Sequence, residues 1–390
     1  MSIFAAVMTG KGTGAISTVQ VFGEGAEAVI QKIFKSAHNV PPALKTGKIY
    51  LGTIVDGGET IDQVTIGCEG VNTFAINCHG NPLIVEMIMQ LLKKNEATLI
   101  TAEQLLAKIL TAEKYSHTLE VEAKIFQAMA ETIEGTKIIL NQIEGGLGAK
   151  AQNWLRDIKT GKLEQIKNEA AEVLENSRIA KLIMYGCTVV LAGPANSGKS
   201  TLLNYLAGKQ KAIVTDIKGT TRDWVSSKCK IGAIVAEIID TAGLDEQFAQ
   251  INDESIESQA QKKSLEILQK ADLVLLVLDG NQSNSQFNEN IVKKIADKKI
   301  LTVINKSDLP AKLEVSRPEE FVQISAKSGT GIENLLKKIQ RSLGVVGFDL
   351  GSAVCFTDRQ QRLVKKLAES KSKDEAVSAI TELLNGGIEV

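Results

Sequence analysis

The sequence feature that most constrains the fold is a glycine-rich loop near the middle of the chain. Residues 193–200 read G-P-A-N-S-G-K-S and fit the pattern G-x-x-x-x-G-K-[ST]. The loop directly follows an apolar run at 188–192 and opens a helix-forming stretch at 201–206. A loop that joins a strand to a helix in this way binds phosphate through backbone N–H groups at the positive end of the helix dipole. The pattern therefore predicts a nucleotide-binding α/β domain.

Each position of this loop has a task that suits its residue type. The glycines let the backbone approach a phosphate closely, the lysine adds positive charge at the β and γ phosphates, and the serine hydroxyl is a ligand for Mg2+. The alternative is a chance match, and the strand and helix on either side argue against it. We therefore assign the nucleotide contacts to Gly193, Asn196, Ser197, Gly198, Lys199, Ser200 and Thr201, with Ser200 also on Mg2+.

Three later segments predict that the nucleotide is GTP. D-T-A-G at 240–243 ends an apolar run, which places the carboxylate of Asp240 near Mg2+ and the N–H of Gly243 near the γ phosphate. N-K-S-D at 305–308 ends another, and Asp308 can accept both hydrogens of the guanine N1 and N2 edge, which adenine does not offer. S-A-K at 325–327 completes the base pocket through a backbone contact to the guanine carbonyl. The further nucleotide contacts are therefore assigned to Asn305, Lys306, Ser325, Ala326 and Lys327.

The rest of the sequence predicts two further parts. Short β-branched runs, Gly-rich turns and two helix-like stretches up to about residue 110 indicate a small α+β domain. Apolar residues recur every three or four positions over 117–184, which predicts a helical bundle, and G-G-L-G at 145–148 breaks two of its helices. We expect a multidomain α/β protein: a P-loop GTPase domain with a Ras-like parallel sheet (187–345), inserted in a helical domain (113–186 plus 346–390) and preceded by the α+β domain (1–112).

The composition excludes several classes of protein. Lys plus Arg (45) balances Asp plus Glu (46), so no overall basic field holds nucleic acid and any RNA contact is local. The five cysteines are odd in number and lack C-x-x-C spacing, which argues against a disulfide framework or a zinc site and fits a reducing cytosol. No apolar run approaches the roughly 18 residues that span a bilayer. We expect a cytoplasmic protein that does not span a membrane.

One segment carries a resemblance to a known family. V-T-D-I-K-G-T-T-R-D at 214–223 closely resembles the first switch of the tRNA-modification GTPases of the MnmE (TrmE) family. The residue after Gly243 is Leu244, which cannot orient a water as the glutamine of Ras-like enzymes does. The resemblance implies instead that a potassium ion (K+) activates GTP hydrolysis, with Asn196 among its ligands. The alternative for Asn196 is a polar residue that fills the loop.

The resemblance also implies two catalytic residues. Thr221 would be the switch threonine on Mg2+, and Thr220 competes for that role. Glu257 falls where the family has a water-orienting glutamate in an I-E-x-x-G-I stretch. The loop before Glu257 is longer than usual and Gln259, Ala260 and Gln261 replace the x-G-I, so the alternative for Glu257 is a solvated helix carboxylate.

Two N-terminal segments extend the resemblance. M-T-G-K-G-T-G-A-I-S at 8–17 is similar to the opening strand and turn of the family, and I-N-C-H-G at 76–80 to its E-x-x-x-H-G-G segment. The resemblance implies an N-terminal domain that dimerises and binds formyl-tetrahydrofolate. It further implies a homodimer that modifies the wobble uridine (U34) of tRNA together with an FAD-dependent MnmG (GidA)-like protein.

The chain also departs from the family. There is no arginine before Arg156, although the family has an R-P-G-E-F-T segment there, and the sequence ends without the family's C-x-G-K. The missing arginine argues against a clamp for the folate carboxylate, and no catalytic cysteine is expected at the C-terminus. The glutamate expected before His79 is missing, and with no metal-ligand partners at sensible spacing we interpret His79 as a buried turn histidine. We interpret Cys355 as a small buried residue.

Three functions fit these observations. The first is an MnmE-like enzyme that couples GTP hydrolysis to modification of the wobble uridine. The second is a GTPase switch or assembly factor that retains the GTPase domain and has lost the folate and cysteine chemistry. The third is a structural dimer that binds GTP without hydrolysing it.

Overall fold

The chain forms two compact units. The computed structural model describes residues 2–10, 12, 14–37, 44–112, 117–209, 225–240, 267–283, 298–313 and 321–388. Among these, the first unit comprises the residues up to Ile125 and from Gly387, and the second comprises the residues from Phe126 to Gly386. No described helix is long and apolar enough to cross a membrane. The boundaries between the three predicted domains stay a prediction.

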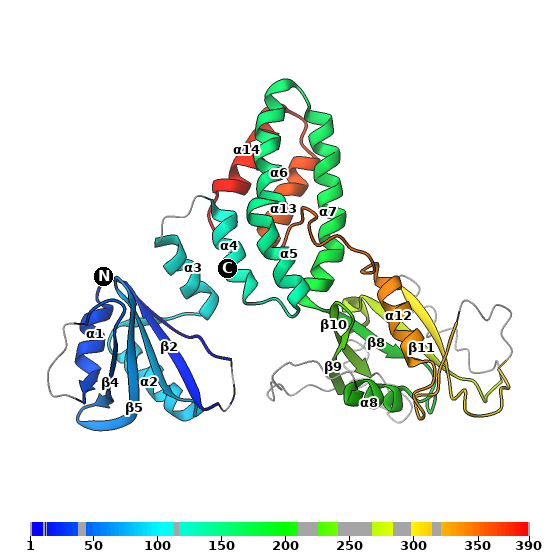
Figure 1. Cartoon of the computed structure of the whole chain (residues 1–390), viewed down its shortest axis with the longest axis horizontal. Helices are drawn as coiled ribbons and strands as arrows, with labels where there is room; N and C mark the ends of the chain where they lie inside the picture. Colours follow the sequence, from blue (N-terminus) through cyan, green and yellow to red (C-terminus); the bar gives the residue numbers. More distant parts are fainter. Residues whose placement is uncertain are drawn as a thin grey trace, which may run out of the picture. The chain divides into compact units, whose positions relative to one another are not determined.

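A seven-stranded sheet organises the first unit (Figure 1). The strand order is β3-β4-β5-β6-β2-β1-β7, and all neighbours are antiparallel except the parallel pair β1 and β7. The strands are β1 (Ile3–Val7), β2 (Ile16–Phe22), β3 (Phe34–Ser36), β4 (Ile49–Asp56), β5 (Glu59–Gly70), β6 (Thr73–His79) and β7 (Ala97–Leu99). The antiparallel hairpins follow the β-branched runs of the sequence, as expected for an α+β domain.

Helices α1 (Ala26–Ile33) and α2 (Pro82–Lys94) cover one face of this sheet. Their apolar faces, which include Ile30 and Leu92, pack into one core with inward-facing strand residues such as Val19 and Ile66. The alternation of buried and exposed residues along the strands produces this face, because successive side chains point to opposite sides. Helix α3 (Ala102–Ala112) packs on β1, and α4 (Thr118–Gln127) ends in the second unit.

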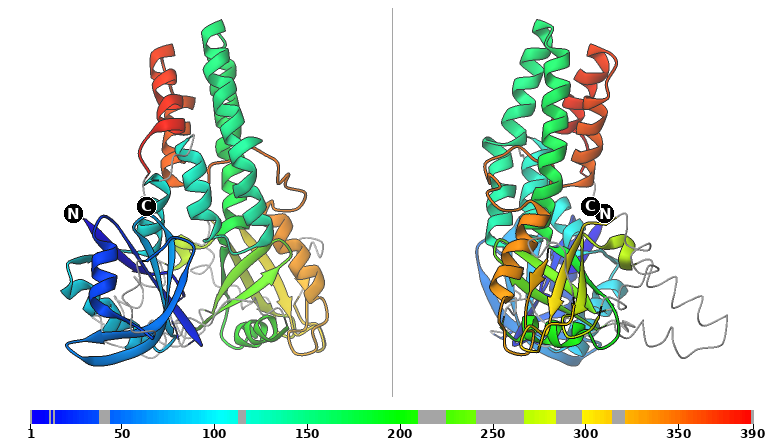
Figure 2. Two further views of the ribbon diagram at one scale, coloured as in Figure 1. Left: turned by 60° about the vertical axis from the view of Figure 1, so that its left-hand side comes forward. Right: turned by 90° about the vertical axis from the view of Figure 1, so that its right-hand side faces the viewer.

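The helices of the second unit come from two distant parts of the sequence. Helices α5 (Ile133–Glu144), α6 (Leu147–Asp157) and α7 (Leu163–Tyr185) precede the second sheet, and α13 (Asp358–Ala368) and α14 (Lys373–Asn385) follow it. Helix α13 packs on α7 and α14, and α14 packs on α6 (Figure 2). Gly145 and Gly146 separate α5 from α6, as the sequence predicts. The second sheet is therefore inserted between two parts of one helical bundle.

Buried polar side chains attach the segment that returns from the sheet to this bundle. The amide of Gln142 in α5 donates to the Ser352 carbonyl (3.1 Å), and its oxygen accepts the N–H of Val354 (2.9 Å). The hydroxyl of Ser177 in α7 accepts the N–H of Cys355 (2.7 Å). These bonds satisfy the backbone of a segment without a strand partner, which would otherwise be costly to bury. Cys355 is buried, as predicted.

The second sheet has six strands in the order β13-β12-β11-β8-β10-β9. The pairs are parallel except for the antiparallel pair β10 and β9. Its strands are β8 (Cys187–Ala192), β9 (Val225–Ile231), β10 (Ile234–Asp240), β11 (Leu273–Asp279), β12 (Ile300–Asn305) and β13 (Val322–Gln323), accompanied by α8 (Lys199–Lys209) and α12 (Ile332–Leu343). The apolar runs of the sequence are the parallel strands, and β9 is an edge strand that the sequence analysis missed.

Candidate nucleotide-binding site

The predicted nucleotide residues gather at the carboxyl edge of the second sheet. The loop 193–198 follows β8, Asp240 ends β10, Asn305 ends β12, and Ser325 follows β13. Parallel strands bring their carboxyl ends to the same edge, and ligands of open α/β sheets bind there. The topology therefore unites segments that lie more than a hundred residues apart in the sequence.

The glycines of the phosphate-binding loop have no room for a side chain. A Cβ on Gly193 (φ +138°) would lie 2.1 Å from the carbonyl oxygen of Val277, and one on Gly198 (φ +94°) would lie 2.2 Å from Nδ2 of Asn305. Asn196 also adopts a left-handed conformation, with φ at 60°. Glycine tolerates these conformations because it has no Cβ. The G-x-x-x-x-G spacing is thus a requirement of the backbone path.

Two buried polar groups of this loop are arranged for an anion. Lys199 is 3% exposed, and its Nζ donates to the carbonyls of Gly193 (2.7 Å) and Pro194 (3.0 Å). Ser197 is 1% exposed, and its hydroxyl is one of two buried side-chain oxygens in the described part of the chain that make no hydrogen bond. A buried hydroxyl without a partner is costly, so a ligand that accepts a hydrogen bond from it is favoured here. This donor set fits a phosphate group.

A hydroxyl and a carboxylate are joined at the start of α8. Ser200 Oγ donates to Oδ2 of Asp240 at 2.5 Å, which connects the phosphate-binding loop to the end of β10. Mg2+ prefers a small number of protein oxygens beside phosphates and waters. The two side chains are therefore a suitable donor pair for a nucleotide-bound magnesium ion.

Asn305 connects the phosphate-binding loop to the predicted base pocket. Its Nδ2 donates to the carbonyl of Ser197 (2.9 Å), and its Oδ1 accepts the N–H of Ala326 (2.9 Å). Asn305 is buried, so both halves of its amide are used in a low-dielectric setting. The Ala326 amide is engaged by this bond, and the predicted backbone contact from 325–327 to the guanine carbonyl stays a prediction.

A hydrogen bond from Ser325 favours the ionised form of Asp308, the predicted guanine-reading carboxylate. The hydroxyl of Ser325 hydrogen-bonds to Asp308 and is the main cause that lowers the pKa of this carboxyl below its usual value. The nearby cations Lys327 and Lys306 act in the same direction. A carboxylate that stays ionised at neutral pH can accept two hydrogens from one base edge.

Asp279 is a further residue at this edge of the sheet, and it was not predicted from the sequence. Nζ of Lys306 pairs with Oδ2 of Asp279 at 2.8 Å, and Asp279 also accepts the N–H of Asn281. Lys306 has a φ of 63°, so its backbone is in the left-handed region. The sequence does contain a pattern that predicts Asp279, because this residue ends the apolar run of β11 at the carboxyl edge, just as Asp240 ends β10.

Several predicted residues lie outside the described part of the chain. These are the switch threonines Thr220 and Thr221, Gly243, and Glu257. Thr201 and Lys327 belong to the described segments that follow β8 and β13. The roles assigned to these residues stay predictions.

The interpretation of His79 as a buried histidine is wrong. Its side chain is 66% exposed at the end of β6, and Nδ1 lies 2.7 Å from Oδ1 of Asp62. Asp62 is buried, and its Oδ2 accepts the backbone N–H of His79 (2.8 Å). The acid comes from the neighbouring strand β5, which a search of the residues just before His79 could not find.

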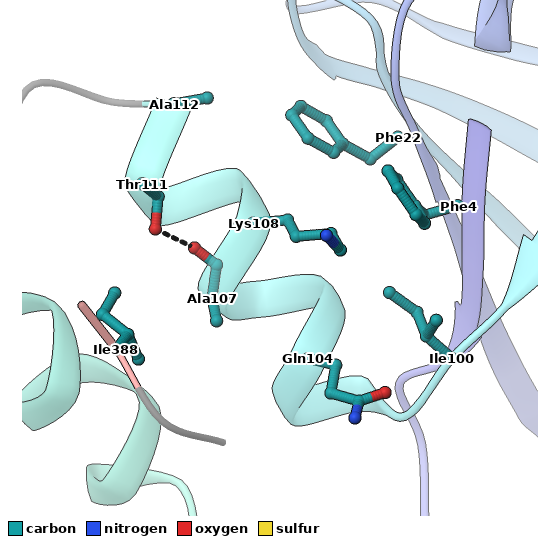
Figure 3. A pocket seen from close by; sticks show the side chains of 9 residues that line it. All are labelled: Phe4, Phe22, Ile100, Gln104, Ala107, Lys108, Thr111, Ala112 and Ile388. Atoms are coloured by element: carbon teal, nitrogen blue, oxygen red, sulfur yellow. Dashed lines mark hydrogen bonds between the residues drawn. The ribbon is translucent and has the colours of Figure 1, made fainter. Parts of the chain in front are cut away.

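An open hollow of about 900 Å³ lies in the first unit beside α3 (Figure 3). Phe4, Phe22 and Ile100 form an apolar wall, and Nζ of Lys108 lies 4.2 Å from the centroid of the Phe4 ring. Ile388 contributes to the lining as well. The described lining includes no carboxylate that could accept a hydrogen bond from the amino group of a pterin. The described lining of this hollow therefore does not match the hydrogen-bonding edge of formyl-tetrahydrofolate.

The mostly parallel sheet and the site at its carboxyl edge define a P-loop GTPase. Sequence profiles of two known families match the chain: one described as 50S ribosome-binding GTPase covers residues 188–306, and one described as GTP-binding protein TrmE N-terminus covers residues 3–104. The chain belongs to the MnmE (TrmE) family of tRNA modification GTPases. It is accordingly a GTP-hydrolysing enzyme, as predicted.

Individual relatives support this assignment over nearly the whole chain. The tRNA modification GTPase MnmE of Enterococcus faecalis is 27% identical over 98% of this chain and 88% of its own length. The Thermotoga maritima protein of that name is 28% identical, covering 98% of this chain and 91% of its own. The Ligilactobacillus salivarius protein is 30% identical over 86% of this chain and 79% of its own.

Proposed function

We propose that this protein is a potassium-stimulated GTPase of the cytoplasm that couples GTP hydrolysis to modification of the wobble uridine (U34) of tRNA. The observation that carries the proposal is the phosphate-binding loop, with Ser200 joined to Asp240, in a chain that matches MnmE proteins over nearly its whole length. We further propose that it acts as a homodimer with an MnmG-like partner. Both statements follow the family, and the described residues add the chemistry of the GTPase site.

The chemistry of this site follows from its donors. GTP hydrolysis forms a bond between a water oxygen and the γ phosphorus and breaks the bond to the bridging oxygen, giving GDP and phosphate. Lys199 and the Ser197 hydroxyl would donate to phosphate oxygens, and Asp308 would hold the guanine. Mg2+ on Ser200 and Asp240, with Thr221 as a further ligand, would neutralise phosphate charge. Glu257 would orient the attacking water.

Potassium stimulation is tested through Asn196. Asn196 is an exposed residue of the phosphate-binding loop, and a side-chain amide oxygen suits a hard monovalent cation. We expect Asn196→Ala to hydrolyse GTP at equal rates in potassium and in sodium. GTP affinity should change by less than about threefold, since the phosphate donors are intact. Turnover of both proteins is measured in matched K+ and Na+ buffers. Potassium stimulation of the variant equal to that of the wild type would contradict the assignment of Asn196 as a potassium ligand.

The tRNA function is tested by nucleoside mass spectrometry of bulk tRNA. Cells that lack their own MnmE receive the wild-type gene or a Lys199→Ala version, each with and without the MnmG of the source organism. We expect aminomethyl-type uridines only with intact Lys199, because modification requires GTP turnover. If no combination restores them while the purified protein hydrolyses GTP, the modification proposal fails.

One observation favours a second function. The whole first unit up to Ile125 has no arginine, although the family resemblance calls for one in its folate segment. A GTPase switch or assembly factor without one-carbon chemistry would need no such residue. Retention of formyl-tetrahydrofolate by the purified protein separates the two functions.

A further inference from the structure

The start of α5 and the end of α7 form a rigid joint. The N–H of Glu131 donates to the carbonyl of Met184 (2.8 Å), and Thr132 Oγ1 donates to the carbonyl of Ile183 (2.6 Å). A Cβ on Gly135 would lie 2.7 Å from Cα of Met184, so the two helices touch backbone to backbone. Close packing of this kind transmits displacement rather than absorbing it.

The joint is tied directly to the strand that carries the phosphate-binding loop. Helix α7 ends at Tyr185, and Gly186 leads into β8. Gly186 has a φ of 81°, and a Cβ there would lie 2.6 Å from the carbonyl of Val235 in β10 and 3.4 Å from Oε2 of Glu131. At Gly186, the start of β8 therefore lies within a few ångströms of both β10 and the helical joint.

The edge strand β9 is attached to this joint by an ion pair. Nζ of Lys228 lies 2.5 Å from Oε1 of Glu131, and the two side chains are 37% and 26% exposed. Strand β9 begins at Val225, two residues after the end of the stretch that resembles the first switch of the family. Val225 pairs with Asp240, the predicted magnesium ligand, so β9 starts beside the phosphate site. Lys228 is three residues, or about 10 Å, further along the strand.

A second carboxylate faces the same lysine. Glu237 of β10 stands directly opposite Lys228 in the antiparallel register. It also accepts a hydrogen bond from Ser226 (3.0 Å), the residue two positions nearer the phosphate site. Lys228 can therefore bind a carboxylate of the helical joint or one of its own sheet. A partly exposed ion pair exchanges between such partners at low cost, unlike the backbone packing beside it.

We propose that Lys228 is a latch that reports the nucleotide state of the GTPase site to the helical bundle by pairing with Glu131 in one state and with Glu237 in the other. This inference rests on the proposed GTP-coupled function and names the element that carries its signal. A chain movement at the start of β9 shifts Lys228. The change of partner then breaks or forms the ion pair between Lys228 and Glu131 at the start of α5. Lys228 and Glu131 are positioning residues that do not touch the nucleotide.

The test is amide hydrogen exchange of the full chain with GDP and with a non-hydrolysable GTP analogue. The variants are Lys228→Glu, Glu131→Lys and the double charge swap. Lys230→Glu is the matched control, because Lys230 is exposed on the same face of β9 two residues away. In the wild type we expect exchange at the start of α5 to differ between the nucleotides. Each single reversal reduces that difference by about fivefold or more, in the range of ordinary allosteric coupling, and the double swap restores most of it.

A structural role alone would not give this pattern. GTP affinity should stay within about threefold in every variant, and the Lys230→Glu control should behave as the wild type. A nucleotide difference that persists in both single reversals, or one that the double swap fails to restore, overturns the latch. If a reversal unfolds the protein, Lys228→Met removes the charge while keeping the length of the side chain. A protein that hydrolyses GTP without any response at α5 refutes the latch alone, whereas missing uridine modification refutes the proposed function.

Discussion

Lys199→Ala should lower GTP turnover by about 10²–10³-fold or more, the cost of removing one preorganised donor from a transition state. Lys199 is buried, and its Nζ is already held 2.7 Å from the carbonyl of Gly193, so little rearrangement is needed to reach a phosphate oxygen. Charge accumulates on the phosphate oxygens as the bond to the bridging oxygen breaks. The loss should therefore appear mainly in kcat.

Single-turnover hydrolysis and GDP affinity, measured side by side, separate catalysis from binding. GDP affinity should fall much less than turnover, because the backbone N–H groups of the loop still hold the phosphates. Lys312→Ala is the matched control, an exposed lysine of the same sheet domain that should change neither value. Thermal unfolding checks that the variant is folded. Turnover within about threefold of the wild type would contradict the assignment of Lys199.

The sequence predicts the fold of the second unit well because its signals are local. The apolar runs of β8, β10, β11 and β12 are continuous, as strands buried on both faces require. The glycine pattern at 193–198 reflects backbone geometry that no other residue type satisfies. Edge strand β9 escaped prediction because its S-S-K-C-K sequence lacks such a run.

Contacts between distant residues account for what the sequence did not reveal. Asp62 supports His79 from another strand, and Gln142 binds the return segment more than 200 residues away in the chain. Neither pairing follows from spacing, because each depends on strand register or on how helices pack. Lys306 and Asp279 form an intermediate case, since Asp279 ends β11, Lys306 directly follows β12, and topology alone would have brought them together.

Asp308→Asn should reverse the base preference of the site from guanine to xanthine. The carboxylate is expected to accept the N1 and N2 hydrogens of guanine, and the hydrogen bond from Ser325 lowers the pKa of this carboxyl further below its usual value. An amide in its place accepts one hydrogen and turns its own donor toward the guanine amino group. Hydrogen bonds to a charged group contribute about 1.5–3 kcal/mol each, so GTP affinity should fall by about 10²-fold.

Xanthine carries an oxygen where guanine carries the amino group, so the new amide can donate to that oxygen and accept the N1 hydrogen. XTP should therefore bind the Asp308→Asn protein more tightly than GTP does, whereas the wild type should prefer GTP. Competition of each triphosphate against a fluorescent GDP or XDP measures both affinities. Glu333→Gln, at an exposed carboxylate on α12 that pairs with Lys337, is the control and should leave the preference for GTP unchanged. A variant that loses affinity for both bases equally would show that Asp308 supports the loop without recognising the base. A residue that recognises the base must favour the base whose edge matches its own donors and acceptors.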